Sequence, residues 1–312
     1  MNVYKKNTTF TRITSCGIGN FGIDSIDQIA ASSSTDIHLV GIDTDEVLLS
    51  QSSAKTQICI GSKTAKAIAA QRNIFTKAFD KSNLIFIIAD SGEALGCDIV
   101  PIVSKLVRKP EVLCVGLVMH SDQYENQHII EWAHTSLETT VQAVDSLLVI
   151  PEDTISGYAP AEIAAKVVST FLLLLNRLGI LSLLFSDVVA LMRGSGYAFM
   201  GLGCAEGEGA ALKAACQAMD FPLLGRDRLA RATRCITQIN SGSALLFGEF
   251  QQAGIAVRDA TPYDCCHIID VTPKKETHAP VEVTIIAMGL DNKVPVEGDS
   301  PRIIPEGISL KK

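Results

Sequence analysis

The chain has 312 residues, 47% hydrophobic and 20% charged, which is enough apolar material for more than one buried core. A net charge of −7 and an aromatic content of 5% exclude the basic, aromatic-rich composition of nucleic-acid-binding proteins. The nine cysteines include no CxxC pair, which favours a reduced, cytoplasmic chain. Cys265, Cys266 and His267 are neighbours on an expected strand and would point to opposite faces, so we expect no metal site there.

The first half of the sequence alternates between short apolar runs and longer segments with helical spacing. The runs are rich in Ile, Val and Leu and cover residues 37–42, 84–89, 112–118 and 147–150. Residues 129–144 show the apolar spacing of a helix. This alternation is typical of a parallel sheet covered by helices on both faces.

The longest apolar stretch lies in the middle of the chain, at residues 167–185. Asn176 and Arg177 interrupt it, and neither half reaches the roughly 20 residues of a membrane span. We interpret it as part of a buried central helix. Beyond it, a helical pattern at 206–219 and strand patterns at 235–239, 267–271 and 281–287 predict an α+β arrangement.

These patterns predict an N-terminal parallel-sheet domain over residues 1–158 and a central helix over 159–178. A smaller α+β domain is expected over residues 179–290, followed by a short tail over 291–312. Three prolines and little periodicity mark the tail: Pro295, Pro301 and Pro305.

One local motif points to a nucleotide. Residues 17–22 read GIGNFG, which matches GxGxxG, and Asp43 ends the next expected strand. Read alone, this pattern indicates a nicotinamide-dependent dehydrogenase. The glycines have a more general effect, because they let backbone amides approach the phosphate of any nucleotide at a helix N-terminus. The dehydrogenase remains an alternative that an NAD-binding measurement tests.

Several further segments, in order along the chain, resemble one family. Asp43-Thr44-Asp45 is similar to the NTD that ends the second strand of FtsZ, and VDSLLVIPED at 144–153 is similar to its VDTLIVIPND. GILSLLFSDV at 179–188 follows the family's GLINLDFADV, and AFMGLG at 198–203, PLL at 222–224 and AMG at 287–289 continue the series. The chain thus resembles the FtsZ branch of the FtsZ/tubulin superfamily from about residue 12 to 290. The resemblance implies a parallel-sheet, Rossmann-like and GTPase-like domain joined by a long central helix to a smaller α+β domain.

The resemblance also implies where a nucleotide would lie, across the carboxyl ends of the sheet. The matching, vestigial positions here are Gly17, Gly19, Gly22, Asp24, Asp43, Gly92, Gly96 and Glu125. The family's second phosphate loop, GGGTGTG, corresponds to residues 89–98, where Leu95 and Cys97 replace the threonines and Asp90, Glu93 and Asp98 add carboxylates. Two like charges near 4 Å repel by about 4 kcal/mol at an effective dielectric near 20, so we expect weak or lost GTP binding. We interpret this loop as a solvated turn.

Other family contacts are replaced as well. His120 stands for an arginine, Glu152 for an asparagine, and Ala161 for the residue that reads guanine. In FtsZ, two aspartates of the loop after the central helix complete the site of the next subunit. Here Asp187 matches one of them and Leu184 replaces the other, so we expect little or no GTPase activity. A lone Asp187 near a helix start is also suited to capping.

The leading hypothesis is an FtsZ-like cytoskeletal protein that self-assembles head to tail or modulates an active FtsZ. Its expected filament interface comprises Ser182, Leu183, Leu184, Phe185 and Asp187. No cofactor is required in this view, and GTP or GDP with Mg²⁺ enters only if the pocket is competent. The alternative is a slow GTP-hydrolysing FtsZ homologue of cell division. No adaptor-docking peptide is identified after Gly289, so we expect no direct membrane anchor.

Overall fold

The computed structural model of the chain describes residues 11–32, 37–61, 68, 70–121, 127–175, 184–241, 247–273 and 279–290. Its N-terminal half is a parallel sheet of β1 (Ile13–Ile18), β2 (His38–Asp43), β3 (Thr56–Cys59), β4 (Leu84–Asp90), β5 (Leu113–His120) and β6 (Ser146–Pro151). They lie side by side in the order β3-β2-β1-β4-β5-β6, and every neighbouring pair is parallel. All carboxyl ends therefore share one edge. Residues 84–89 of β4 are entirely buried, which explains their uninterrupted apolar run.

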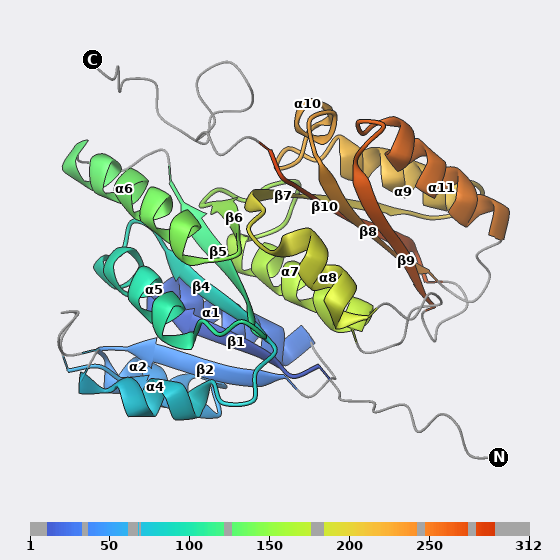
Figure 1. Cartoon of the computed structure of the whole chain (residues 1–312). Helices are drawn as coiled ribbons and strands as arrows, with labels where there is room; N and C mark the ends of the chain where they lie inside the picture. The colour runs from blue at the N-terminus through green and yellow to red at the C-terminus, as the bar shows by residue number, and fades with distance from the viewer. Residues whose placement is uncertain are drawn as a thin grey trace, which may run out of the picture.

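Helices cover both faces of this sheet (Figure 1). Helices α1 (Gly19–Ser32) and α7 (Pro160–Leu175) pack together against one face, where the rings of Phe86 and Phe171 are 5.4 Å apart. Helices α4 (Arg72–Ala78), α5 (Ala94–Val107) and α6 (Gln127–Ala143) belong to the core of the other face, and α2 (Glu46–Gln51) packs beside β2 and β3. The buried central helix predicted from the sequence is α7.

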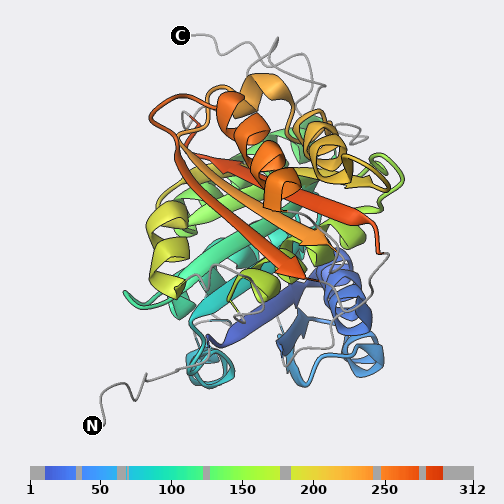
Figure 2. The same ribbon diagram turned by 90° about the vertical axis from the view of Figure 1, so that its right-hand side faces the viewer.

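The C-terminal half extends the same sheet. Its elements are α8 (Phe185–Met192), β7 (Gly196–Ala205), α9 (Ala210–Met219), α10 (Arg226–Leu229), β8 (Arg234–Ser241), α11 (Phe247–Asp259), β9 (Cys266–Pro273) and β10 (Val281–Met288). Strand β7 pairs in parallel with β6 and antiparallel with β10; β8 is antiparallel to β10 and parallel to β9. Figure 2 shows α9 and α11 lying together over one face of these strands. The predicted α+β second half is confirmed.

One sequence expectation needs adjustment, and another is left as it was. The helix expected from residue 206 begins at Ala210, because Gly207 and Gly209 have φ angles of +78° and +68°, outside the helical region. The proposed domain limits stay a prediction, since a single 10-stranded sheet runs through both halves of the described chain. Among the described helices, none is both long enough and apolar enough to cross a membrane.

Candidate functional site at the carboxyl edge of the sheet

The loops that follow the parallel strands meet at one edge of the sheet, where open α/β sheets bind ligands. They include Gly19 after β1, Asp43 at the end of β2, Asp90 at the end of β4, His120 at the end of β5, and Glu152 after β6. The structure thus places these segments, far apart in sequence, at one edge. Glu125 lies outside the described residues.

Three of the predicted glycines are needed by backbone packing. A Cβ atom on Gly17 would overlap the carbonyl oxygen of Gly22, and one on Gly22 would overlap that of Ile88. A Cβ atom on Gly96 would overlap the carbonyl oxygen of Asp90. These glycines bring β1, β4 and the helices that follow into close contact, whatever the edge binds.

The start of α1 faces a carboxylate of the chain itself. Gly19 has φ +73°. The Glu93 Oε2 atom accepts the backbone N–H of Asn20 at 3.3 Å, and its Oε1 atom accepts the Asn20 side-chain amide at 3.2 Å. A Cβ atom on residue 19 would overlap Glu93 Oε2, so only glycine leaves room for this carboxylate.

The loop after β4 is a turn that is partly buried, since Ser91 is buried while Gly92 and Glu93 are partly exposed, so the solvated turn expected from the sequence is seen only in part. Ser91 is buried and its Oγ lies 2.8 Å from His120 Nδ1, while Leu95 is buried in the core. Asp90 Oδ1 accepts the Gly92 N–H at 2.7 Å. Burial raises the pKa of Asp90 to about 6, against the lowering effect of the Gly92 hydrogen bond and with a further upward push from nearby carboxylates.

The charged side chains that act on Asp90 are both carboxylates. They belong to Glu93 and Glu152, and each raises the pKa of Asp90. Burial lowers the pKa of His120 to about 4, with a smaller contribution from His134, whose ring centroid is 5.3 Å away. His120 is therefore neutral near pH 7, and it supplies no cation where the family has an arginine.

Two further predicted residues are used or placed differently. Asp43 is buried, and its Oδ1 accepts the N–H groups of Thr44 at 2.6 Å and Asp45 at 2.9 Å, so this carboxylate stabilises the turn after β2. Asp24 lies on the exposed side of α1. Its pKa is raised by partial burial and then by the neighbouring Asp27.

The opposite end of the subunit carries the expected interface segment. Helix α7 starts beyond the carboxyl end of β6 and, with 16 residues, runs roughly 24 Å back towards the amino ends of the strands. Leu184, just before α8, is 58% exposed, and Phe185 is partly buried against the core. Asp187 is exposed and its Oδ2 accepts the Leu184 N–H at 3.0 Å, so it caps α8. Ser182 and Leu183 lie outside the described residues.

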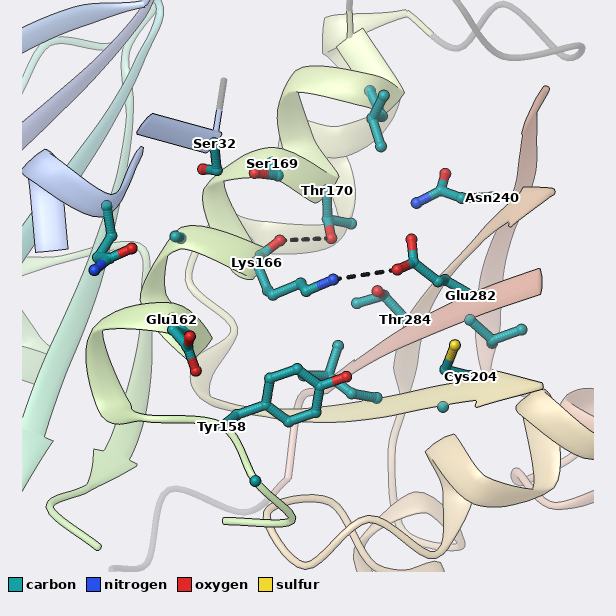
Figure 3. A pocket seen from close by; sticks show the side chains of 17 residues that line it. Ser32, Tyr158, Glu162, Lys166, Ser169, Thr170, Cys204, Asn240, Glu282 and Thr284 are labelled. Atoms are coloured by element: carbon teal, nitrogen blue, oxygen red, sulfur yellow. Dashed lines mark hydrogen bonds and ion pairs between the residues drawn. The ribbon is translucent and has the colours of Figure 1, made fainter. Parts of the chain in front are cut away.

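A cleft that the sequence analysis did not anticipate separates α7 from the C-terminal strands (Figure 3). Its volume is about 460 Å³. Lys166 on α7 reaches Glu282 on β10 at 3.4 Å and lies 5.9 Å from the ring centroid of Tyr158. The sequence signal that could have indicated this contact is Lys166, the one basic residue of α7.

The described parts of the chain hold no group of three or more His, Cys, Asp or Glu side chains arranged to bind a metal ion. His267, which follows the adjacent free cysteines Cys265 and Cys266, has its Nε2 atom 2.7 Å from Thr261 Oγ1.

Comparison with known proteins agrees with this architecture. Residues 196–291 match the model of the FtsZ family C-terminal domain. The empty FtsZ dimer of M. jannaschii superimposes with a TM-score of 0.80 at 22% identity, covering 95% of this chain and 96% of that one. The GTPγS-bound protofilament of CetZ2 from Haloferax volcanii gives a TM-score of 0.74 at 17% identity, covering 88% and 92%.

A CetZ from Methanosaeta thermophila gives a TM-score of 0.73 at 15% identity, covering 89% of this chain and 87% of that one. The chain therefore has the two-part fold of the tubulin/FtsZ superfamily. The fold that the resemblance implied is confirmed, and residues 196–291 match the FtsZ family's C-terminal domain.

Proposed function

We propose that this chain is an FtsZ-like cytoskeletal protein that assembles head to tail into filaments, with GTP binding and hydrolysis weak or lost. The observation that carries the proposal is the state of the carboxyl edge. There, Glu93 covers the start of α1, and Asp90 and Glu152 stand beside the neighbouring loop.

Electrostatics supports the loss of nucleotide affinity. A triphosphate at this edge would face carboxylates, while the neighbouring His120 is neutral near pH 7. One like-charge contact near 4 Å costs about 4 kcal/mol at an effective dielectric near 20. A micromolar affinity corresponds to only about 8 kcal/mol, so two such contacts would remove it.

The geometry of the subunit suits an open, head-to-tail contact. Leu184 precedes α8, whose final residue is followed by Arg193, and the Arg193 guanidinium donates to the carbonyls of Pro110 and Val112 just before β5, on the amino side of the sheet. The carboxyl edge is on the other side, and a heterologous contact between opposite ends produces a filament rather than a closed dimer. The similar FtsZ structure is a dimer and the similar CetZ2 structure is a protofilament, which supports the same mode of assembly here. The partner subunit is a second copy of this chain or another FtsZ.

A second candidate is a slow GTPase acting in cell division. The retained turn at Gly19 and the helix that follows it favour this candidate, because such a turn presents amides to phosphate. Heating the purified protein distinguishes the two: one released GDP or GTP per chain supports the GTPase, and none supports the proposed function. Asp187 is the remaining acidic residue for this chemistry, and its carboxylate is engaged in capping.

The proposed function is tested by assembly without nucleotide. Protein stripped of nucleotide with apyrase and EDTA should pellet at high speed and show filaments by negative-stain electron microscopy. A chain that stays monomeric at every accessible concentration, with and without GTP, would contradict the proposal.

A further inference from the structure

We propose that Glu93 is an internal anion that occupies the phosphate position of the first glycine loop, and that its negative charge keeps inorganic phosphates and nucleotides out. This inference rests on the proposed function in one respect, because it treats the carboxyl edge as a former nucleotide site. It adds a cause: a single side chain closes the loop from within the molecule.

The contacts of Glu93 are those of a bound anion. Both carboxylate oxygens are used, one by the backbone N–H of Asn20 and one by its side-chain amide, at 3.3 and 3.2 Å. The partner is the start of α1, a helix of 14 residues whose first amides favour negative charge. The missing Cβ of Gly19 supplies the space for Oε2.

Glu93 precedes α5, but its carboxylate accepts hydrogen bonds from a different helix, α1. Glu93 is the N-cap residue of α5, a position where shorter side chains such as Asp, Asn and Ser usually accept amides of the same helix. Among the described amides of α5, however, its carboxylate caps none. It crosses instead to a helix whose sequence lies more than 70 residues earlier, with |i−j| of 73 to Asn20.

A phosphate group bound to these amides would have to displace the Glu93 carboxylate or sit beside it. Either event is unfavourable, since the first removes two hydrogen bonds and the second places like charges in contact. Glu93 also raises the pKa of Asp90, so its charge is felt across the loop. Removing this charge should open the amides of α1 to an external anion.

The test compares four proteins: the wild type, Glu93→Gln, Glu93→Ala and Asp98→Asn. Asp98 is exposed on the same helix, so its substitution removes one negative charge without touching α1. Binding of inorganic pyrophosphate and of Mg²⁺–GTP is measured by calorimetry, at concentrations where light scattering shows no assembly. Both Glu93 variants should bind at least about tenfold more tightly than the wild type, whereas Asp98→Asn, which removes a loop charge but leaves the Asn20 contacts intact, should gain clearly less than either of them.

An NMR measurement tests the contact between Glu93 and Asn20 directly, without relying on binding affinity. The Asn20 amide signal should shift in Glu93→Gln and exchange faster with solvent in Glu93→Ala, and it should be unchanged in Asp98→Asn. An equal gain in affinity for Asp98→Asn, or no gain in either Glu93 variant, would overturn the inference. Assembly of the wild-type protein without nucleotide is measured separately, so failure of this inference and failure of the proposed function are distinguished.

Discussion

Replacing Leu184 tests the proposed filament contact quantitatively. Burying a whole leucine side chain contributes about 1.5–3 kcal/mol. Leu184 is 58% exposed in the subunit, so a neighbouring subunit could bury a share worth about 0.9–1.7 kcal/mol. Since 1.4 kcal/mol corresponds to a factor of ten, Leu184→Ala should raise the critical concentration of assembly about 4- to 18-fold. Leu184→Asp should abolish filaments, because it adds the cost of burying a charge.

The assay is sedimentation over a range of protein concentrations, which gives the critical concentration directly. Leu212 provides the matched control, because it is a partly exposed leucine, at 37%, on α9 in the outer helical layer. Leu212→Ala and Leu212→Asp should change the critical concentration by less than about twofold. Unchanged assembly in Leu184→Asp would refute this account of the interface, and circular dichroism would verify that the variant is folded.

Three further predictions concern stability. The folded-state pKa of Asp90 is raised from 3.8 to about 6, so its ionisation opposes folding as pH rises through this window. The free energy of unfolding of Asp90→Asn, measured with urea, should therefore exceed that of the wild type by roughly 1–3 kcal/mol at pH 7 and equal it at pH 4. Gly96→Ala should lose about 2–4 kcal/mol because its Cβ would overlap the Asp90 carbonyl, whereas Gly61→Ala, with open space around it, should lose less than about 1 kcal/mol. Asp145→Ala should cost about 2–3 kcal/mol because the buried carboxylate accepts a backbone N–H at 2.9 Å, while Asp80→Ala, in an exposed ion pair, should cost less than about 1 kcal/mol in thermal melts.

The pH prediction requires comparison with the wild type for a physical reason. His120 is a second titrating group in the same region, and its lowered pKa makes stability fall as pH drops from about 6.5 to about 4. Asp90 has the opposite effect over an overlapping range. The difference between Asp90→Asn and the wild type isolates the carboxylate.

Much of the fold could be predicted because buried parallel strands leave a clear mark on a sequence. The run at 84–89 is apolar throughout since both of its faces are covered, and α7 was predicted from its length and apolar character. Strand β3 was missed because its four residues, Thr56–Cys59, lie at the sheet edge and alternate weakly. The start of α9 was placed too early because helical spacing continues through glycines that have left-handed backbone angles.

The candidate site was predictable in its location but less so in its contacts. The resemblance predicts that Glu93 stands in a position of the glycine loop, but only the structure shows that it reaches Asn20, 73 positions away. Likewise, Asp187 and Asp43 were identified by motif, and the structure shows that both carboxylates accept backbone amides near their own positions. Such local hydrogen bonds compete with a role toward a ligand, which motif spacing alone cannot resolve.

The carboxyl edge of the sheet and the cleft beside α7 are held by different kinds of interaction. At the edge, the backbone is constrained by glycines at which a Cβ atom would overlap a carbonyl oxygen, so the course of these loops is fixed by close backbone packing. At the cleft, Lys166 and Glu282 join α7 to β10 by a partly exposed ion pair, which contributes less than about 1 kcal/mol. We therefore expect substitutions to disturb the backbone of the carboxyl edge more than they disturb the cleft.

The most direct test of the central claim is the critical concentration of nucleotide-stripped wild-type protein, measured by sedimentation with and without Mg²⁺–GTP. If assembly has separated from nucleotide, the two values should agree within about twofold, a free-energy difference of less than about 0.5 kcal/mol. A critical concentration that falls tenfold or more with GTP would contradict the account, because it would show that the acidic carboxyl edge still binds nucleotide and couples it to assembly.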